Sequence, residues 1–572
     1  MSEDVLGRFL GSDEFPIEWD EGESDLFWVF DDLHVPNPVS PMFFDIGGWW
    51  LTCDHMFRRF GTPFACDWIA KRINGYVYTA AIPCRPHVMP EATEYNARYA
   101  PRVPRRLGYA NRIAGYLDWV LPHYAANFTD WWRDRLRPEI EANFARLDAI
   151  DYDAASLVEL AVLLEDAIDM HDRHWKIHWM LNLAQFASTA KLAEVAAEIK
   201  GEISPELLGR LQSSLDDRNW DSIRDLWRLK SEVAGDDELR TAFEAGTAAG
   251  VLARLADTDR GREFLRRGLE PYQAAYGYKS IWSHEFAYPT WREDPSPIIE
   301  AIRGYVVSDY DYPANLQAVS DDLAAAKSEL MEGVEGEDSE RLQSALDLAL
   351  GMNPLTPDHH FYCDQGTNAR LRIVLIGIGR KLERDVLESA EDIMCLQYQE
   401  LREVMAGTHE FDPKELVADR RDELEDAAEV RPRSWVGTVT QEALDFPYVV
   451  NWGFPEKFEM GEPTTTGELR GLAASPGVVE GRARFVSSPD EFSQIEPGDI
   501  LVCRMTNPAW VIAFTKIGGL ITEAGGITSH PAVIAREFGI PAVVGANNAS
   551  ERVHTGDRVR VNGSSGLVEI LS

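Results

Sequence analysis

The sequence is poor in cysteine and in long apolar runs, and each scarcity excludes a class of protein. Cysteines account for only 6 of the 572 residues, and none of them forms a C-x-x-C pair, so no zinc or redox motif is visible. A reduced, cytoplasmic setting fits this usage. The apolar runs are too short to cross a bilayer, and the acidic start lacks the apolar core of a signal peptide. We therefore expect neither a metal site nor a membrane partner.

Basic charge is also scarce, because 56 lysines and arginines stand against 95 aspartates and glutamates, which gives a net charge of −39. Nucleic acids and anionic membranes are bound through basic surface, so neither is an expected partner. The acidic field repels phosphates, and any phosphate chemistry must depend on local hydrogen-bond donors. A phosphate-cradling G-x-x-x-x-G-K-[ST] loop is missing as well, so the chain is not expected to bind ATP by itself.

The residues that are present divide into an aromatic-rich, helical part and a glycine-rich C-terminal part. Residues 1–110 are rich in aromatics, which fits either a bulky core or the wall of a pocket for a flat apolar ligand. Most of the following residues show amphipathic helical periodicity. Short strands and Gly-rich turns replace this pattern near the C-terminus. We predict a multidomain protein: a mostly α-helical, acceptor-binding domain over residues 1–455, a hinge linker over 456–468 and an α/β domain over 469–572.

Three histidines share one face of a predicted helix that runs from Ala154 to Phe186. His171, His174 and His178 follow each other at spacings of three and four and interrupt an apolar stripe, so they point into the interior. No carboxylate of this segment shares their face, which argues against a metal site. Buried histidines that pair only with neighbours and histidines that bind substrate are both consistent with the pattern.

A second histidine group, His359-His360, lies at the start of another helical segment. Adjacent helical residues diverge by about 100°, so at most one of the two points at any given pocket. A general base for a hydroxyl nucleophile must reach its proton and titrate near neutral pH, as histidine does. One of this pair, oriented by Asp364, is the first candidate for that role. A pair that bonds only the backbone is the structural alternative.

The strongest chemical signal is the stretch Gly525-Gly526-Ile527-Thr528-Ser529-His530-Pro531, which follows a short apolar run. Pro531 suits a first helical turn, so His530 is predicted at a helix N-terminus. That end carries partial positive charge and unpaired N–H groups, and it favours an anion such as a phosphoryl group on the imidazole. The two glycines allow close backbone approach, and Thr528 or Ser529 can donate to a phosphate oxygen.

Residues 469–572, almost end to end, resemble the swivelling phosphohistidine domain of the phosphoenolpyruvate-utilising enzymes. The resemblance rests on the G-G-x-T-S-H stretch and on the flanking segments Gly471–Gly481, Thr506–Trp510 and Phe538–Gly545. One departure is Pro531, where the family has alanine. Upstream, Tyr276-Gly277-Tyr278-Lys279 resembles a family segment with a His-Arg pair at its end, so no role carries over to Tyr278 and Lys279.

The architecture resembles the larger subunit of phenylphosphate synthase and of the 4-cresol-phosphorylating enzymes, which act in aromatic compound degradation. The resemblance implies that His530 carries a phosphoryl group from ATP to a small phenolic hydroxyl, giving aryl phosphate, AMP and phosphate. It also implies a hetero-oligomer, in which an ATP-grasp-like partner subunit binds ATP and Mg²⁺ and this chain holds no permanent cofactor. The phosphate loop would be Gly525 and Gly526. The catalytic residues would be His530, Thr528, Ser529, His359 and His360. The substrate would be bound by His171, His174 and His178.

Two alternatives remain open on the sequence. The same chemistry can serve another acceptor, such as an antibiotic hydroxyl. A phosphorelay or regulatory protein can also keep the histidine domain for signalling without being an enzyme. An ordered site that carries the predicted histidines would favour the enzyme, and a solid helical domain without one would favour the relay.

Overall fold

The computed structural model describes the chain from residue 5 to residue 571 with interruptions. It leaves out residues 33, 56–58, 60–64, 84–108, 202, 283, 308–310, 445–466, 488, 507–509, 515, 526–529 and 547. The described chain divides into two compact units. Unit 1 comprises Met1–Ala187, Ser283–Ala287 and Tyr362–Pro455, and unit 2 comprises Ser188–Trp282, Tyr288–Phe361 and Glu456–Ser572. Among the described helices, none combines the length and the apolarity that a bilayer-spanning segment requires.

Unit 1 contains an antiparallel five-stranded sheet in the order β1-β5-β2-β4-β3. Its hairpin forms where the sequence places Asn74-Gly75, a pair suited to a tight turn because both residues adopt positive φ, 48° and 82°. All four residues of β2 are buried, which fixes this strand in the middle of the core. The strands are β1 (Val5–Phe9), β2 (Phe27–Phe30), β3 (Ala65–Ile73), β4 (Tyr76–Pro83) and β5 (Trp435–Thr440).

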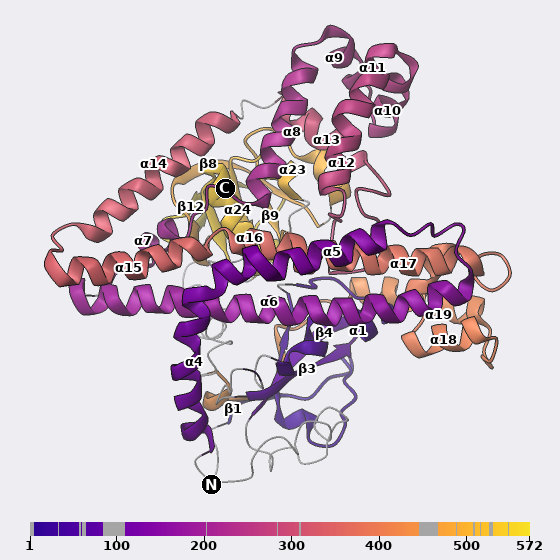
Figure 1. Ribbon diagram of the computed structural model, residues 1–572, viewed down its shortest axis with the longest axis horizontal. Helices are drawn as coiled ribbons and strands as arrows, with labels where there is room; N and C mark the ends of the chain where they lie inside the picture. Colours follow the sequence, from indigo (N-terminus) through magenta and orange to yellow (C-terminus); the bar gives the residue numbers. More distant parts are fainter. Residues whose placement is uncertain are drawn as a thin grey trace. The chain divides into compact units, whose positions relative to one another are not determined.

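The helices of unit 1 are organised around the predicted three-histidine helix, which is confirmed as α6 (Leu157–Lys200). This helix belongs to unit 1 as far as Ala187. Figure 1 shows α5 beside it, and the His174 side chain of α6 contacts Asn143 of α5. The other described helices of unit 1 are η1 (Glu23–Asp25), α1 (Pro41–Ile46), η2 (Trp49–Thr52), α4 (Tyr109–Trp131), η4 (Trp132–Leu136), α5 (Arg137–Asp148), α17 (Gly366–Leu382), η7 (Ala390–Cys395), α18 (Tyr398–Ala406), α19 (Pro413–Glu429) and α20 (Gln441–Leu444).

Unit 2 combines helices with a mixed eight-stranded sheet in the order β6-β13-β12-β8-β9-β10-β11-β7. Strands β8, β9, β10 and β11 run parallel and carry the buried centre of the sheet. The strands are β6 (Glu468–Arg470), β7 (Leu472–Ser475), β8 (Val478–Phe485), β9 (Ile500–Cys503), β10 (Gly519–Thr522), β11 (Ala542–Val544), β12 (Arg558–Asn562) and β13 (Leu567–Ile570). The predicted fold class, a mostly helical protein with a C-terminal α/β domain, is confirmed.

The helices of unit 2 form one apolar core with one face of this sheet. Further helices pack on the last turns of α6 in a smaller cluster. The described helices of unit 2 are α7 (Pro205–Leu211), α8 (Arg218–Ala234), α9 (Asp237–Phe243), α10 (Ala248–Asp257), α11 (Asp259–Phe264), η5 (Leu265–Leu269), α12 (Glu270–Tyr276), α13 (Ser296–Val307), α14 (Tyr312–Met331), α15 (Gly336–Met352), α16 (Leu355–His359), η8 (Pro489–Gln494), α23 (Val511–Phe514), α24 (His530–Phe538) and α25 (Ala549–Arg552). The small cluster on α6 takes its helices from α7, α14 and α15. The π-helix η6 (His360–Gln365) contains the boundary between the two units. The predicted hinge lies outside the described residues from 456 to 466.

Candidate functional site

The predicted phosphate site lies at the carboxyl end of a parallel strand. Strand β10 is fully buried, and the nine-residue helix α24 begins at His530, with Pro531 in its first turn. The predicted helix start at His530 is therefore confirmed. Gly525, between strand and helix, has φ of 104°, a conformation that other residues rarely adopt. In open α/β sheets, anions bind where parallel strands end and helices begin.

Helix α24 is held in place by contacts on its inner face and at Arg536. Gly526, Thr528 and Ser529 lie outside the described residues, so their predicted roles remain predictions. The inner face of the helix is sealed, because Ala532, Ile534, Ala535 and Phe538 are buried. The guanidinium of Arg536 donates to the carbonyl of Ala474 on β7 at 2.9 Å. These contacts fix where the helix N-terminus lies within unit 2.

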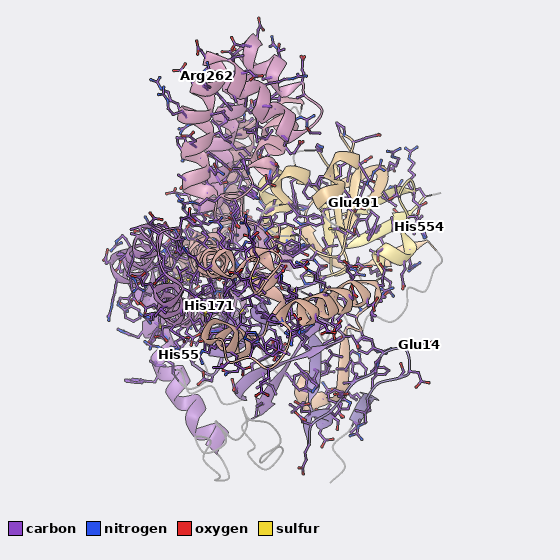
Figure 2. The ribbon with its side chains drawn as sticks, turned by 90° about the vertical axis from the view of Figure 1, so that its right-hand side faces the viewer. Glu14, His55, His171, Arg262, Glu491 and His554 are labelled. Atoms are coloured by element: carbon purple, nitrogen blue, oxygen red, sulfur yellow. The ribbon has the colours of Figure 1, made fainter. Side chains whose placement is uncertain are left out.

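The three-histidine face of α6 is buried as predicted, and two of its rings bond to neutral groups inside unit 1. His174 is fully enclosed: its Nδ1 contacts the Thr367 hydroxyl at 2.8 Å, and the Asn143 amide donates to its Nε2 at 3.1 Å. Burial, with the nearby His171, lowers the pKa of His174 to about 3, so the ring stays neutral. His171, also enclosed and labelled in Figure 2, donates from Nε2 to the carbonyl of Gly47 at 3.1 Å.

His178 differs because it meets a carboxylate. Its Nδ1 donates to Oδ1 of Asp364 at 3.0 Å, and the amide of Asn182 donates to its Nε2 at 2.8 Å. Asp364 was predicted to orient His359 or His360, and the bond to His178 was not predicted. It is almost completely buried and comes from the π-helix η6, 186 residues away in sequence. A π-turn shifts side chains around the helix axis and is common at functional sites. The π-helix thus places the Asp364 carboxylate beside the histidine face of α6, which has no carboxylate of its own.

A histidine–carboxylate pair that the sequence analysis missed lies just after β2. Nδ1 of His34 donates to Oδ1 of Asp31 at 2.7 Å, and the indole N–H of Trp49 donates to Oδ2 of the same carboxylate at 2.7 Å. Burial opposes the charge on Asp31, but His34 outweighs it and lowers the pKa of this carboxyl. Burial likewise opposes protonation of His34, and the Asp31 charge and hydrogen bond still raise the pKa of the ring.

His284 was missed as well, and it completes the cluster in unit 1. Its ring centroid lies 5.5 Å from that of His34 in an edge-to-face arrangement, and its Nε2 lies 3.7 Å from Oδ2 of Asp364. The short segment that carries it is clamped on both sides. The buried Glu285 accepts from the backbone and hydroxyl of Ser40 at 2.8 and 2.6 Å, and the buried Arg372 donates to the carbonyl of Phe286.

Tryptophans enclose this cluster, which we call the histidine cluster and define as Asp31, His34, His178, His284 and Asp364. The ring centroid of Trp175 lies 4.6 Å from that of His178, and the ring centroid of Trp49 lies 5.7 Å from that of His34. Trp179 packs on Trp49 at 5.6 Å between ring centroids. The aromatic N-terminal segment and the histidine helix, predicted separately from the sequence, therefore meet. Two carboxylates and three imidazoles, packed against indole rings, are groups that can hold and move a proton.

The predicted pair His359 and His360 belongs to unit 2. His359 is buried and donates from Nδ1 to the carbonyl of Leu355 at 3.0 Å, as the backbone-bonding alternative requires. His360 is half-buried. The two ring centroids lie 4.1 Å apart and the ring planes are tilted by 35°, so the two rings pack against each other. The role of either ring as a base stays a prediction.

A weak signal for the missed residues is present in the sequence. Asp31 and His34 are three residues apart directly after a buried aromatic strand, a spacing that closes a local turn in which the His34 N–H also reaches Asp31 at 3.2 Å. His284 stands beside Glu285 in an aromatic segment between Trp282 and Trp291. The first spacing is common in turns, and the second pattern has no distinctive spacing because the partners of His284 come from other parts of the chain.

Two family models match the chain. Residues 495–566 match the mobile domain of the PEP-utilising enzymes, the segment that contains β10 and α24. Residues 178–353 match the fourth domain of rifampicin phosphotransferase. The first match confirms the predicted resemblance of the C-terminal domain, and the second adds a domain type that the sequence analysis did not name.

Several curated proteins are similar over long stretches. An uncharacterised phosphotransferase, YvkC of Bacillus subtilis, is 31% identical over 400 residues, which cover 69% of this chain and 47% of the relative. A rifampicin phosphotransferase of Bacillus cereus is 30% identical over 54% of this chain and 35% of its own length. Chondramide synthase of Chondromyces crocatus is 27% identical over 98% of this chain and 14% of its own length. The chain spans less than half the length of each of these relatives.

The matches agree with the geometry at the start of α24, where a histidine begins a helix at the end of a parallel strand. The chain therefore carries the mobile domain of the PEP-utilising enzymes together with a domain of the rifampicin phosphotransferase type, and its two Bacillus relatives are phosphotransferases.

Proposed function

We propose that this protein is a phosphotransferase that carries a phosphoryl group on His530 and delivers it to a hydroxyl acceptor. The observation that supports it most is the position of His530 at the start of α24 and the carboxyl end of β10, inside the mobile-domain match. Helix N–H groups and the helix dipole stabilise the negative charge of a phosphoimidazole at that position. Thr528 and Ser529 are the proposed donors to its oxygens, with Gly525 and Gly526 as the phosphate loop.

The proposed acceptor is a small phenol bound in unit 1. Indole faces of Trp49, Trp175 and Trp179 favour a flat aromatic ring, and the histidine cluster beside them supplies groups that handle a hydroxyl proton. A phenolic hydroxyl has a pKa of about 10 and is mostly protonated at neutral pH, so it needs such a group before it attacks phosphorus.

The proposed donor is ATP with Mg²⁺ on a separate ATP-grasp-like subunit. ATP and water would give AMP, phosphate and phosphorylated His530, and the phenol would then take the phosphoryl group. The proposal rests on the missing phosphate-cradling loop in the sequence. It predicts that calorimetry detects no stoichiometric ATP binding to this chain alone. Tight binding of ATP to this chain would contradict the assignment of the ATP site to a partner subunit.

The carrier step can be tested without the partner, because phosphoramidate phosphorylates imidazoles directly. The full chain is treated with labelled phosphoramidate, and mass spectrometry of peptides locates the phosphoryl group. We expect His530 to be labelled and added phenol to discharge it as phenyl phosphate. Discharge at the rate of hydrolysis in water, with every phenol tried, would contradict transfer to a phenolic hydroxyl.

A second candidate acceptor is an antibiotic hydroxyl. It is favoured by the match of residues 178–353 to a rifampicin phosphotransferase domain. The same charged protein is offered rifampicin and a panel of simple phenols in parallel. Faster discharge to rifampicin would select the antibiotic acceptor, and faster discharge to phenols would select the small aromatic one.

A further inference from the structure

The turn that follows β2 is built rigidly around one carboxylate. Both oxygens of Asp31 are engaged, Oδ1 by the ring and backbone N–H of His34 and Oδ2 by the indole of Trp49. The backbone is fixed as well, since the N–H of Asp31 donates to the carbonyl of Val77 at 3.0 Å and the N–H of Val35 donates to that of Asp31 at 3.1 Å. The imidazole of His34 is thus held in one orientation with Nδ1 protonated.

The consequence of this arrangement is a basic nitrogen at a fixed place. With Nδ1 donating to the carboxylate, Nε2 of His34 keeps its lone pair. An imidazole that is oriented by a carboxylate on one nitrogen and open on the other has the geometry of a general base.

His34 also differs from the other rings around it in accessibility. Its side chain is 17% exposed and that of His284 is 16% exposed, whereas His171 and His174 have no exposed surface. His174 has both ring nitrogens engaged, as does His178. The rings of His34 and His284, which face each other at 5.5 Å, therefore form the side of the histidine cluster that a ligand can reach.

The charges that face His34 favour its protonated form. Asp31 is in contact, and the charges of Asp364 and Asp32 also act on the ring, while His284 is the titratable neighbour that can become cationic. Burial alone would lower the pKa of His34, but these carboxylates raise it above the ordinary value. A stronger base narrows the gap to the pKa of a phenol, about 10, and speeds removal of its proton.

We propose that His34, oriented by Asp31, is the general base that deprotonates the acceptor hydroxyl. This assignment rests on the proposed function. The hydroxyl proton moves to Nε2 of His34 while the hydroxyl oxygen forms a bond to phosphorus. The bond between phosphorus and the ring nitrogen of His530 breaks, its electron pair stays on that nitrogen, and the His530 ring takes up one proton from solvent. His34 then returns its proton to solvent.

The experiment follows the discharge of His530, precharged with phosphoramidate, in single turnover. Phenol and a nitrophenol, whose hydroxyl is far more acidic, serve as the acceptors. We expect His34→Ala to take up the phosphoryl group normally but to transfer it to phenol roughly 100-fold more slowly or worse. Transfer to the nitrophenolate, which needs no base, should be affected much less, and added imidazole should restore part of the phenol rate. His123→Gln, an exposed histidine on α4, is the matched control and should behave as the parent protein.

The pH profile gives a second measurement that a purely structural role would not change. Transfer to phenol by the parent protein should rise with pH through a midpoint above about 6.5, because the neutral form of His34 is the active one. In Asp31→Asn the midpoint should move down and the plateau rate should fall. The profile of the parent protein needs no variant, so misfolding of His34→Ala leaves the test intact.

The outcomes separate this inference from the proposed function. If His530 of the parent protein is charged but never discharges to any hydroxyl, the proposed function fails. If the parent discharges to phenol and folded His34→Ala does so at the same rate, with the same ratio between the two phenols, the assignment of His34 is overturned. An equivalent loss in His359→Ala or His360→Ala, with His34→Ala unaffected, would identify the base in unit 2.

Discussion

The carrier region and the histidine cluster are assembled from the chain in different ways. The carrier region is one continuous stretch, in which β10, a glycine-containing loop and α24 follow each other between Gly519 and Phe538. The histidine cluster takes its members from a turn after β2, from α6, from a short clamped segment and from a π-helix. The first depends on backbone geometry at a helix end, and the second depends on side chains that meet only in the folded unit.

This difference predicts different kinds of failure. A change in the carrier region should abolish one chemical step without a large effect on folding of unit 1. A change in the histidine cluster alters buried hydrogen bonds, so it should affect stability and pH dependence together with transfer. The following experiments test that contrast.

The largest effect is expected from His530→Ala. Removal of the imidazole removes the nitrogen that bonds to phosphorus, so labelling by phosphoramidate at this position and formation of aryl phosphate should fall to background. The matched control is His554→Ala, an exposed residue of the same domain that Figure 2 shows at its surface. Normal turnover in His530→Ala, or an equal loss in His554→Ala, would remove the distinction between the two regions.

The next effect concerns His174 and the acid stability of unit 1. Its pKa is lowered to about 3 in the folded state, chiefly by burial, whereas an unfolded histidine titrates near 6.5. Between pH values of about 3 and 6.5, His174 binds a proton in the unfolded chain but not in the folded chain. The free energy of unfolding therefore decreases as pH falls. The contribution is roughly 1.4 kcal/mol per pH unit across that window.

His174→Gln should therefore cost stability at neutral pH but lose less of it on acidification. Denaturant unfolding at a series of pH values measures the slope. A slope equal to that of the parent protein would show that His174 is not the buried neutral group inferred from its contacts with Asn143 and Thr367.

Asp364→Ala should have a smaller effect on stability. It removes the acceptor for Nδ1 of His178 and leaves that donor buried, which typically costs about 1.5–3 kcal/mol for a hydrogen bond to a charged group. Chemical denaturation of the purified variant gives the value. Asp364→Asn keeps an acceptor in place and should recover part of the loss, so equal effects of the two substitutions would contradict the hydrogen-bond explanation.

The smallest effect is expected from Gly525→Ala. At φ of 104° an alanine is strained, with a cost on the order of 1 kcal/mol, and the strain falls on the loop that leads to His530. Thermal unfolding should shift slightly, while the rate at which His530 accepts a phosphoryl group should drop several-fold. The same drop for Gly556→Ala, a glycine at φ of 104° in another turn of the domain, would show that general strain and not the position of the loop is responsible.

Most of the local features of this protein can be predicted from residue types alone. The G-G-x-T-S-H stretch indicated a helix start at His530, and the period of the histidines on α6 indicated their burial. Each of these depends on hydrogen bonds and φ values within a few residues, so the residue types alone are informative.

The membership of the histidine cluster and the state of each ring depend on how the chain folds. His34 and His284 carry no distinctive spacing, and His174 and His178 look alike in the sequence. His178 is bonded to the carboxylate of Asp364. His174 is bonded to the neutral side chains of Thr367 and Asn143 and stays an uncharged core residue. These assignments depend on burial and on contacts across long separations in the chain, which set the desolvation and charge that move a pKa and leave no trace in the local pattern.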